Sequence, residues 1–315
     1  MTYSIVARDE WSGDLGVAVQ SRALAVGAVV PWARAGVGAV ATQSDANPRY
    51  GSAGLRLLSR GKSVQAVLTD LVGDDDLRAE RQVGIVDARG ESVTFTGEGN
   101  PDWAGGRAGH NYAAQGNVCA GPQVIDRMID TLLGRGQPFP ELLIECLRAA
   151  DAAGGDRRGR QSAALLVVRP DSAFGGLSDR YIDLRVDDAR EPIDELRRLL
   201  DLHRLYHEGA READLLPMDA PTAADVKIQL RRWGLGEGGV PRLPMKREDI
   251  PVAGETTAFP FGWDEAWQEA LVAFLTGVNL WRRNAAPGWI DRRVLETLRG
   301  AAVDLTWLVQ DSPTE

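Results

Sequence analysis

Cysteine and histidine are scarce in this chain of 315 residues, which contains two cysteines and three histidines. Two cysteines are too few for a framework of disulfide bonds, and zinc sites are built mainly from cysteine and histidine side chains. His203 and His207 have the spacing of a metal-binding pair, but the glutamate of the His-Glu-x-x-His motif is missing. We interpret both as packed or surface residues and expect no metal and no cofactor.

Long hydrophobic runs and an excess of basic residues are also missing. No apolar run approaches the roughly 18 residues that indicate a membrane span. The N-terminus has neither the basic segment nor the apolar core of a secretory signal. The net charge of −9 and the isoelectric point near 5.0 argue against a nucleic-acid binder, which carries a basic face. We expect a cytoplasmic protein with no membrane or nucleic-acid partner.

The composition that is present, 44% hydrophobic and 26% charged, is ordinary for a globular protein, and the length favours two domains. Hydrophobic periodicity predicts strands and helices in alternating blocks over the first 190 residues, an order typical of α+β folds with helices outside packed sheets. The expected strands are 2–9, 16–19, 25–30, 36–42, 82–87, 92–96, 113–117, 162–168 and 181–186. The expected helices are 52–59, 64–72 with Ser63 as its N-cap, 121–133 and 140–153. Turn residues predict hairpins between the first two strands and, around Ala88-Arg89-Gly90, between 82–87 and 92–96.

The last third of the chain has a different character. We divide the protein into a first domain (1–190), a connecting helix (191–212) and a small, mostly α-helical domain (213–315), with helices at 219–233, 264–277 and 290–309. The tryptophans of this last part are Trp233, Trp263, Trp267, Trp281, Trp289 and Trp307. Because several lie on apolar helix faces, we favour a helical core over a stacking surface for sugar-like ligands.

The N-terminus combines a small hydroxyl residue with a strand-like alternation that places Tyr3, Ile5 and Ala7 on one face. Methionine is usually removed before a residue as small as threonine, and loss of Met1 leaves Thr2 with a free α-amine beside its hydroxyl. The ordinary pKa of this amine is about 7.7–8.0, so it can accept the hydroxyl proton near neutral pH. Thr2 is then nucleophile and base at once; its plain alternative is the start of a strand.

Polar residues gather beside glycines in four further segments, at 20–22, 42–48, 115–117 and 154–162. Amide hydrolysis needs donors for the developing oxyanion and a group that orients the substrate. We expect Asn117 and a backbone N–H near Gly116 to supply the donors, and Arg22 to keep the amine neutral or to hold a carboxylate. The predicted catalytic residues are Thr2, Asn117 and Arg22. The predicted substrate-binding residues are Ser21, Gln43, Ser44, Asn47, Asp156, Arg160 and Gln161.

Some of these residues also have a structural interpretation. Asn117 suits a turn, and the basic loop at 157–160 suits a solvated surface. Cys119 has no histidine or acid nearby in the sequence, so we interpret it as buried filler rather than as a nucleophile.

Five separated segments resemble the domain of unknown function 1028 family. They are residues 2–9, 15–22, 26–44, 115–117 and 152–164. The resemblance implies the four-layer αββα sandwich of the N-terminal-nucleophile hydrolases, with Thr2 as nucleophile after loss of Met1. It also implies that Gln20, Ser21 and Arg22 lie beside Thr2 on the next strand. Residues 289–299 resemble a helical repeat of peptidoglycan-binding domains.

The sequence therefore predicts an amidohydrolase that cleaves a C–N bond in a small amide, a ureide or a short peptide, and homodimerisation is expected from the fold alone. One alternative is a sandwich without catalysis that binds a glycan or cell-wall fragment through its Trp-rich tail. Another is a structural protein that assembles into oligomers.

Overall fold

The structure is a computed structural model that describes residues 2–101, 103–236, 247–255, 259 and 262–300. The chain divides into two compact units, Met1–Leu200 and Asp201–Glu315. Helix α5 (Pro192–His207) crosses the division, and its apolar residues Ile193, Leu196 and Leu200 belong to the core of the first unit. None of the described helices is long and apolar enough to span a membrane.

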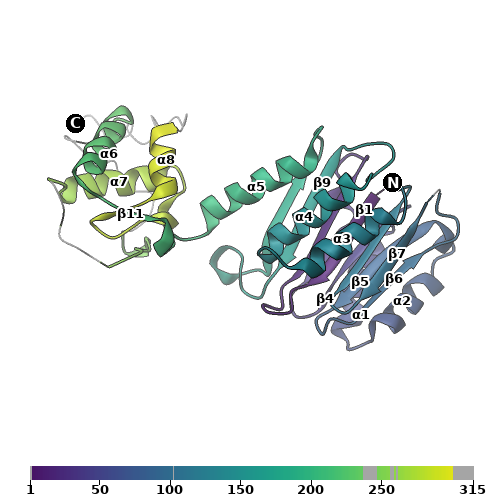
Figure 1. The fold of residues 1–315 in the computed structure, drawn as a ribbon. Coiled ribbons are helices and arrows are strands. Elements are labelled where there is room, and N and C mark those ends of the chain that lie inside the picture. The colour runs from purple at the N-terminus through teal and green to yellow at the C-terminus, as the bar shows by residue number, and fades with distance from the viewer. Residues whose placement is uncertain (1, 102, 237–246, 256–258, 260–261, 301–315) are drawn as a thin grey trace, which may run out of the picture. The chain divides into compact units, whose positions relative to one another are not determined.

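A six-stranded sheet forms the centre of the first unit, in the order β10-β9-β2-β1-β8-β7 (Figure 1). All its pairings are antiparallel. Strand β1 pairs with β2 on one side and with β8 on the other. The predicted hairpin between the first two strands is confirmed. The strands are β1 (Thr2–Arg8), β2 (Leu15–Ser21), β7 (Gly105–Gly109), β8 (Tyr112–Asn117), β9 (Ser162–Val168) and β10 (Arg180–Val186).

A second sheet has four antiparallel strands in the order β3-β4-β5-β6. They are β3 (Pro31–Arg34), β4 (Gly38–Ser44), β5 (Arg81–Asp87) and β6 (Ser92–Thr96). The last two form the hairpin that the sequence predicts around Ala88-Arg89-Gly90.

Two pairs of helices cover the sheets. Helices α3 (Gln123–Gly134) and α4 (Phe139–Ala152) pack on the six-stranded sheet, while α1 (Pro48–Ser59) and α2 (Val64–Gly73) pack on the four-stranded sheet. The predicted N-cap Ser63 accepts a hydrogen bond from the backbone N–H of Ala66, which satisfies an otherwise unpaired donor. The prediction of an α+β protein is confirmed.

The two sheets pack on each other through an apolar cluster that includes Val6 of β1, Val17 of β2, Ala41 of β4 and Val86 of β5. Because successive residues of a strand point to opposite faces, Tyr3 and Ile5 point instead to α3 and α4. The face of β1 that carries Thr2, Ser4 and Val6 is thus the face between the sheets.

The predicted strand at 25–30 is wrong. Ala25 adopts a left-handed backbone conformation (φ 53°), and Val26–Ala28 form a short 3-10 turn. The Ser162 hydroxyl accepts a hydrogen bond from the N–H of Val26 and holds the turn against β9. Val26 and Val30 of this apolar run are buried, while Ala28 and Val29 are exposed, so the run is a partly buried turn and not a strand. Strand β7 was not predicted, since its glycines give no strand pattern.

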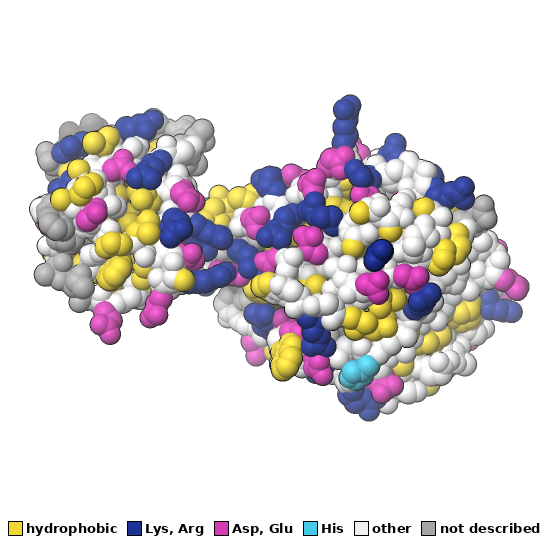
Figure 2. Space-filling view, in the orientation of Figure 1, with side chains coloured by type: hydrophobic (Ala, Val, Ile, Leu, Met, Phe, Trp, Pro, Cys, Tyr) yellow, Lys and Arg dark blue, Asp and Glu magenta, His cyan; other side chains and the backbone are white. Residues whose placement is uncertain are grey.

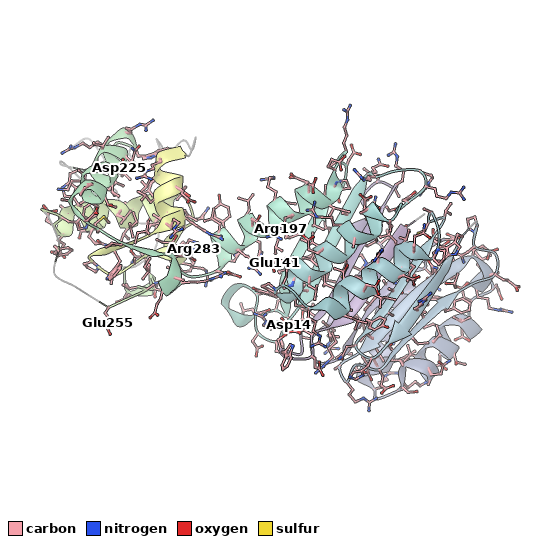
Figure 3. All side chains as sticks on the ribbon, viewed as in Figure 1. Asp14, Glu141, Arg197, Asp225, Glu255 and Arg283 are labelled. Atoms are coloured by element: carbon pink, nitrogen blue, oxygen red, sulfur yellow. The ribbon has the colours of Figure 1, made fainter. Side chains whose placement is uncertain are left out.

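The second unit holds α6 (Ala220–Arg232), α7 (Glu265–Gly277) and α8 (Arg292–Gly300) beside two short paired strands, β11 (Leu215–Pro217) and β12 (Trp289–Asp291). Trp263 and Trp267 are buried in its core, as we favoured, while Trp307 lies outside the described residues. Arg283, which is labelled in Figure 3, forms a buried ion pair of 2.9 Å with Asp291.

Candidate active site

Thr2 lies in the central strand of the six-stranded sheet and is only 6% exposed. Its register partners are Ser21 on β2 and Asn117 on β8. Side chains of directly paired residues share one face of a sheet, so all three lie between the sheets. The Thr2 and Ser21 hydroxyl oxygens are 3.0 Å apart and form a buried hydrogen bond.

A buried polar network continues from Thr2 along this face. The Ser4 hydroxyl donates to Gln43 Oε1 at 2.6 Å and accepts from Gln115 Nε2 at 2.6 Å. Gln43 Nε2 in turn donates to the backbone carbonyl of Thr2 at 3.2 Å. Ser4, Gln43 and Gln115 come from three strands and two sheets, and each is at most 1% exposed. The network therefore holds the start of β1 against the second sheet.

Gln82 on β5 joins this network to Asn117. Its Oε1 accepts from Gln43 Nε2 at 2.8 Å and from Asn117 Nδ2 at 2.9 Å, while its Nε2 donates to the carbonyl of Gly116 at 2.8 Å. A backbone carbonyl can only accept, so this last bond fixes which end of the Gln82 amide is the donor. That orientation then fixes the amides of Gln43 and Asn117.

One N–H of the Asn117 amide therefore donates to Gln82 Oε1. Its Oδ1 is buried and has no hydrogen-bond partner among the described residues. Buried polar groups normally have partners, so this acceptor marks a place where a further donor fits. Asn117 thus offers an acceptor as well as the donor that the sequence predicts.

The layer between the sheets is apolar at one end and polar at the other. Val6, Val17 and Val86 lie in the apolar part. Thr2 lies four residues before Val6 in β1, and Gln82 lies four residues before Val86 in β5. Buried polar side chains are costly unless they are paired. Their concentration around the start of β1 therefore distinguishes this end from an ordinary core.

Gln20 is on the strand beside Thr2, as the resemblance implies, but its side chain is on the opposite face. Its register partner is Tyr3, which packs under α3 and α4. Both amide atoms of Gln20 are buried and lack hydrogen-bond partners among the described residues. The two-residue alternation of β2 brings Ser21, and not Gln20, to the Thr2 side chain.

Arg22 and the loop before β9 form a second, more exposed group. The backbone N–H groups of Arg22 and Arg158 both donate to the buried Asp156 carboxylate, at 2.9 Å each. The Arg22 guanidinium donates to Gln161 Oε1 at 2.8 Å. Ser21 is paired with Ser162 across β2 and β9, which places this group next to the Thr2 strand.

Arg160 is held by carboxylates rather than by neutral groups. It forms ion pairs with Asp151 and Glu191. Hydrogen bonding to Asp151 is the main cause that raises its pKa. Its charge is thus balanced by Asp151 of α4 and by Glu191, whereas the described partner of the Arg22 guanidinium, Gln161, is uncharged.

Ser44 and Asn47 do not join the Thr2 network. Ser44 pairs with Arg81, one residue from Gln82, and therefore lies on the other face of the second sheet. Asn47 caps α1 by accepting from the N–H of Arg49 and donates to Asp75 at 2.9 Å. The segment 42–48 is split by strand alternation: Gln43 faces the other sheet, and its neighbours face α1 and α2.

The sequence family is decided by one comparison. A family model described as a family of unknown function (DUF1028) matches residues 2–196. The chain belongs to the DUF1028 family. The resemblance stated from the sequence is confirmed.

Solved structures extend the comparison. The DUF1028 chain is similar to the crystal structure of protein SPO2555 from Silicibacter pomeroyi, also of family model DUF1028, with 28% identity and a TM-score of 0.59 over 64% of this chain and 89% of that chain. It is more weakly similar to Anbu (ancestral beta-subunit) from Yersinia bercovieri, with 12% identity and a TM-score of 0.32 over 64% and 93%. This second similarity is too low to support a conclusion. No curated protein sequence matches the chain.

Three residues of the polar network around Thr2 were not predicted as site residues from the sequence: Ser4, Gln82 and Gln115. Ser4 and Gln115 share their inward faces with the polar residues Thr2 and Asn117, whereas Gln82 alternates with Gly84 and Val86. That alternation is a usable signal for a polar group between two sheets.

Burial makes Cys119 of the DUF1028 protein an inert thiol. Burial raises its pKa to about 12, so the thiolate is not populated at neutral pH. The described residues contain no group of three or more histidine, cysteine, aspartate or glutamate side chains placed to hold a metal ion.

Proposed function

We propose that this DUF1028 protein is an N-terminal-nucleophile amidohydrolase, active once Met1 has been removed. The observation that carries the proposal is the position of Thr2, buried at the polar end of the layer between two sheets and flanked by Ser21 and Asn117. We further propose that the two helix-covered sheets are the αββα sandwich of that enzyme class.

In the proposed reaction, Thr2 Oγ1 attacks the carbonyl carbon of a small amide, a ureide or a short peptide, and the Thr2 amine takes the hydroxyl proton. Collapse of the tetrahedral intermediate breaks the C–N bond, and the leaving nitrogen takes that proton. Water then hydrolyses the acyl ester and restores the threonine. The Ser21 hydroxyl, 3.0 Å from Thr2 Oγ1, holds the nucleophile in place.

Asn117 and Arg22 have different proposed roles. The second N–H of the Asn117 amide stabilises the oxyanion, and its Oδ1 accepts a hydrogen bond from the Thr2 ammonium. Arg22 orients an anionic substrate, because its described partner Gln161 does not neutralise the guanidinium. Arg160 is less suited to this role, since Asp151 and Glu191 balance its charge.

The test is a screen of amides, ureides and dipeptides with the wild-type chain, Thr2→Ala and Thr2→Ser, together with the intact mass of each protein. We expect turnover by the wild type, residual turnover by Thr2→Ser and none by Thr2→Ala. Turnover by a protein that fully retains Met1, or by Thr2→Ala at the wild-type rate, overturns the mechanism. Absence of turnover together with muropeptide binding by the full chain favours a binding protein instead.

A further inference from the structure

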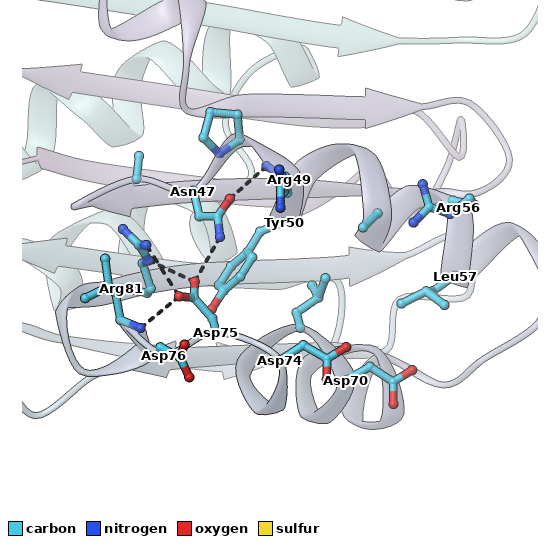
Figure 4. Close-up of a pocket in the computed structure, with 15 residues that line it drawn as sticks. Asn47, Arg49, Tyr50, Arg56, Leu57, Asp70, Asp74, Asp75, Asp76 and Arg81 are labelled. Carbon is cyan, nitrogen blue, oxygen red and sulfur yellow. Dashed lines mark hydrogen bonds and ion pairs between the residues drawn. The ribbon is translucent and has the colours of Figure 1, made fainter.

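A pocket lies on the face of the four-stranded sheet that carries α1 and α2, between α1 and the end of α2 (Figure 4). Its volume is about 740 Å³. This is within the usual range for small-ligand sites, about 300–1,000 Å³. Thr2 and its network lie on the other face of that sheet. The pocket is therefore separate from the proposed active site, and its interpretation does not depend on the proposed reaction.

The floor of the pocket is apolar. It is made by the ring of Tyr50, which is 2% exposed, together with Ala53, Leu57 and Leu71. Tyr50 and the two leucines come from two different helices, α1 and α2. Such a floor gains free energy when it covers an apolar side chain and excludes water.

One end of the pocket is preorganised by Asp75. Its carboxylate accepts from Arg81 Nε, from Asn47 Nδ2 and from the N–H of Leu77, each at 2.9 Å. These hydrogen bonds hold the pKa of Asp75 well below its usual range, and the bond from Arg81 has the largest effect. The charges of Asp75 and Arg81 therefore cancel inside the protein and are not available to a ligand.

The Tyr50 hydroxyl lies beside this ion pair as a neutral donor. Burial, and then the nearby Asp75 carboxylate, raise the pKa of Tyr50, so the phenol stays protonated. The hydroxyl is buried against the Asp75 carboxylate, so it belongs to this preorganised end of the pocket and is not exposed to a ligand.

Unpaired charges of opposite sign flank the floor. Arg49 and Arg56 stand along α1, two helical turns or roughly 10 Å apart, and Figure 4 shows them on the side opposite Asp70 and Asp74. Within the described residues, neither arginine forms an ion pair. Asp70 is paired with Lys62, but among the residues that the structure describes Asp74 and Asp76 form no ion pair.

The helix ends reinforce this division of charge. Helix α1 begins at Pro48 and helix α2 ends at Gly73, and both ends line or adjoin the pocket. A helix N-terminus carries partial positive charge and a C-terminus partial negative charge. The start of α1, at Pro48 and Arg49, therefore favours an anion, and the end of α2 favours a cation.

We propose that this pocket binds a short zwitterionic peptide with apolar side chains. The peptide carboxylate lies at Arg49 and Arg56, and its ammonium group lies at Asp74 and Asp76. An apolar side chain covers the floor between them. A simple anion would contact only the arginines, and an uncharged apolar molecule would contact only the floor. Binding measurements can therefore distinguish both from the proposed ligand.

The test uses Leu-Leu as the probe and isothermal titration calorimetry as the measurement, on the full chain carrying Thr2→Ala so that no probe is consumed. We expect saturable binding at one site with a Kd of about 1 mM or tighter. N-acetyl-Leu-Leu and Leu-Leu-amide each lack one charge, and we expect each to bind roughly tenfold more weakly.

The matched variants are Arg49→Gln with Arg56→Gln, and Arg60→Gln as control, since Arg60 is exposed at the C-cap of the same helix but does not line the pocket. The double variant should weaken Leu-Leu by about tenfold yet leave Leu-Leu-amide unchanged, and Arg60→Gln should change neither. The proposal is overturned by absence of saturable Leu-Leu binding, by capped peptides that bind as well as Leu-Leu, or by an unaffected double variant. None of these results bears on turnover by Thr2.

Discussion

Replacement of Gln82 by methionine tests whether the polar network stabilises the first unit. Methionine is similar in length but can neither accept from Gln43 and Asn117 nor donate to the Gly116 carbonyl. A buried group that loses its partner costs about 1–3 kcal/mol. Gln43 keeps a second bond to Thr2, so we expect a total loss of about 3 kcal/mol in the free energy of unfolding.

Hydrogen exchange of the intact chain, read by mass spectrometry, measures this loss within the first unit alone. A loss of about 3 kcal/mol corresponds to roughly hundredfold faster exchange of the β1, β5 and β8 amides. Gln65→Met, on the exposed face of α2, is the control and should change stability by less than about 0.5 kcal/mol. If Gln82→Met costs less than about 1 kcal/mol, the network is not a significant source of stability.

Three further changes have clear expected outcomes. Arg283→Met leaves the buried Asp291 carboxylate without its partner, and should cost the second unit about 3–5 kcal/mol in urea denaturation. Gly84→Ala places a methyl group 2.1 Å from Gln115 Oε1, and should lower the free energy of unfolding of the first unit by about 1–3 kcal/mol. His203 has its pKa lowered from 6.5 to about 4, chiefly by burial, so the unfolded chain binds the extra proton. Its contribution to stability is complete above pH 6.5 and is lost as the pH falls towards 4; His203→Leu should flatten this slope between pH 6.5 and 5.

Each of these changes has a control at a matched residue. Arg292→Met removes an exposed arginine and should leave the second unit unaffected. Gly73→Ala adds a methyl group where no atom lies within 4 Å. His110→Leu, at an exposed histidine of the first unit, should not alter the pH dependence of the second. Equal effects from a variant and its control would refute the corresponding argument.

Local patterns predict the elements of this protein well, because caps and periodicity act within a few residues. Ser63 at the start of α2 and the alternation of Tyr3 and Ile5 in β1 are both found as expected. The apolar run at 25–30 misled the prediction, because burial of a turn gives the same composition as a strand. The left-handed Ala25 leaves no signal in the sequence.

The candidate site is harder to predict, since its parts meet through the packing of one sheet on another. Thr2, Ser21 and Asn117 were named from the sequence, and the register brings them together. Gln82 was not, because nothing local shows that β5 lies opposite β8. Asn47 was named for its place near Gln43, but it lies beyond the end of β4 and caps α1 instead.

The central position of β1 has a consequence for the order of events during synthesis. Thr2 of β1 leaves the ribosome before its partner Asn117 on β8, which follows 115 residues later. At ordinary rates of translation this interval lasts on the order of ten seconds. An aminopeptidase can reach the nascent end during that interval, before the sheet closes over it. Removal of Met1, which the proposed mechanism requires, is therefore expected to precede the pairing of β1 with β8.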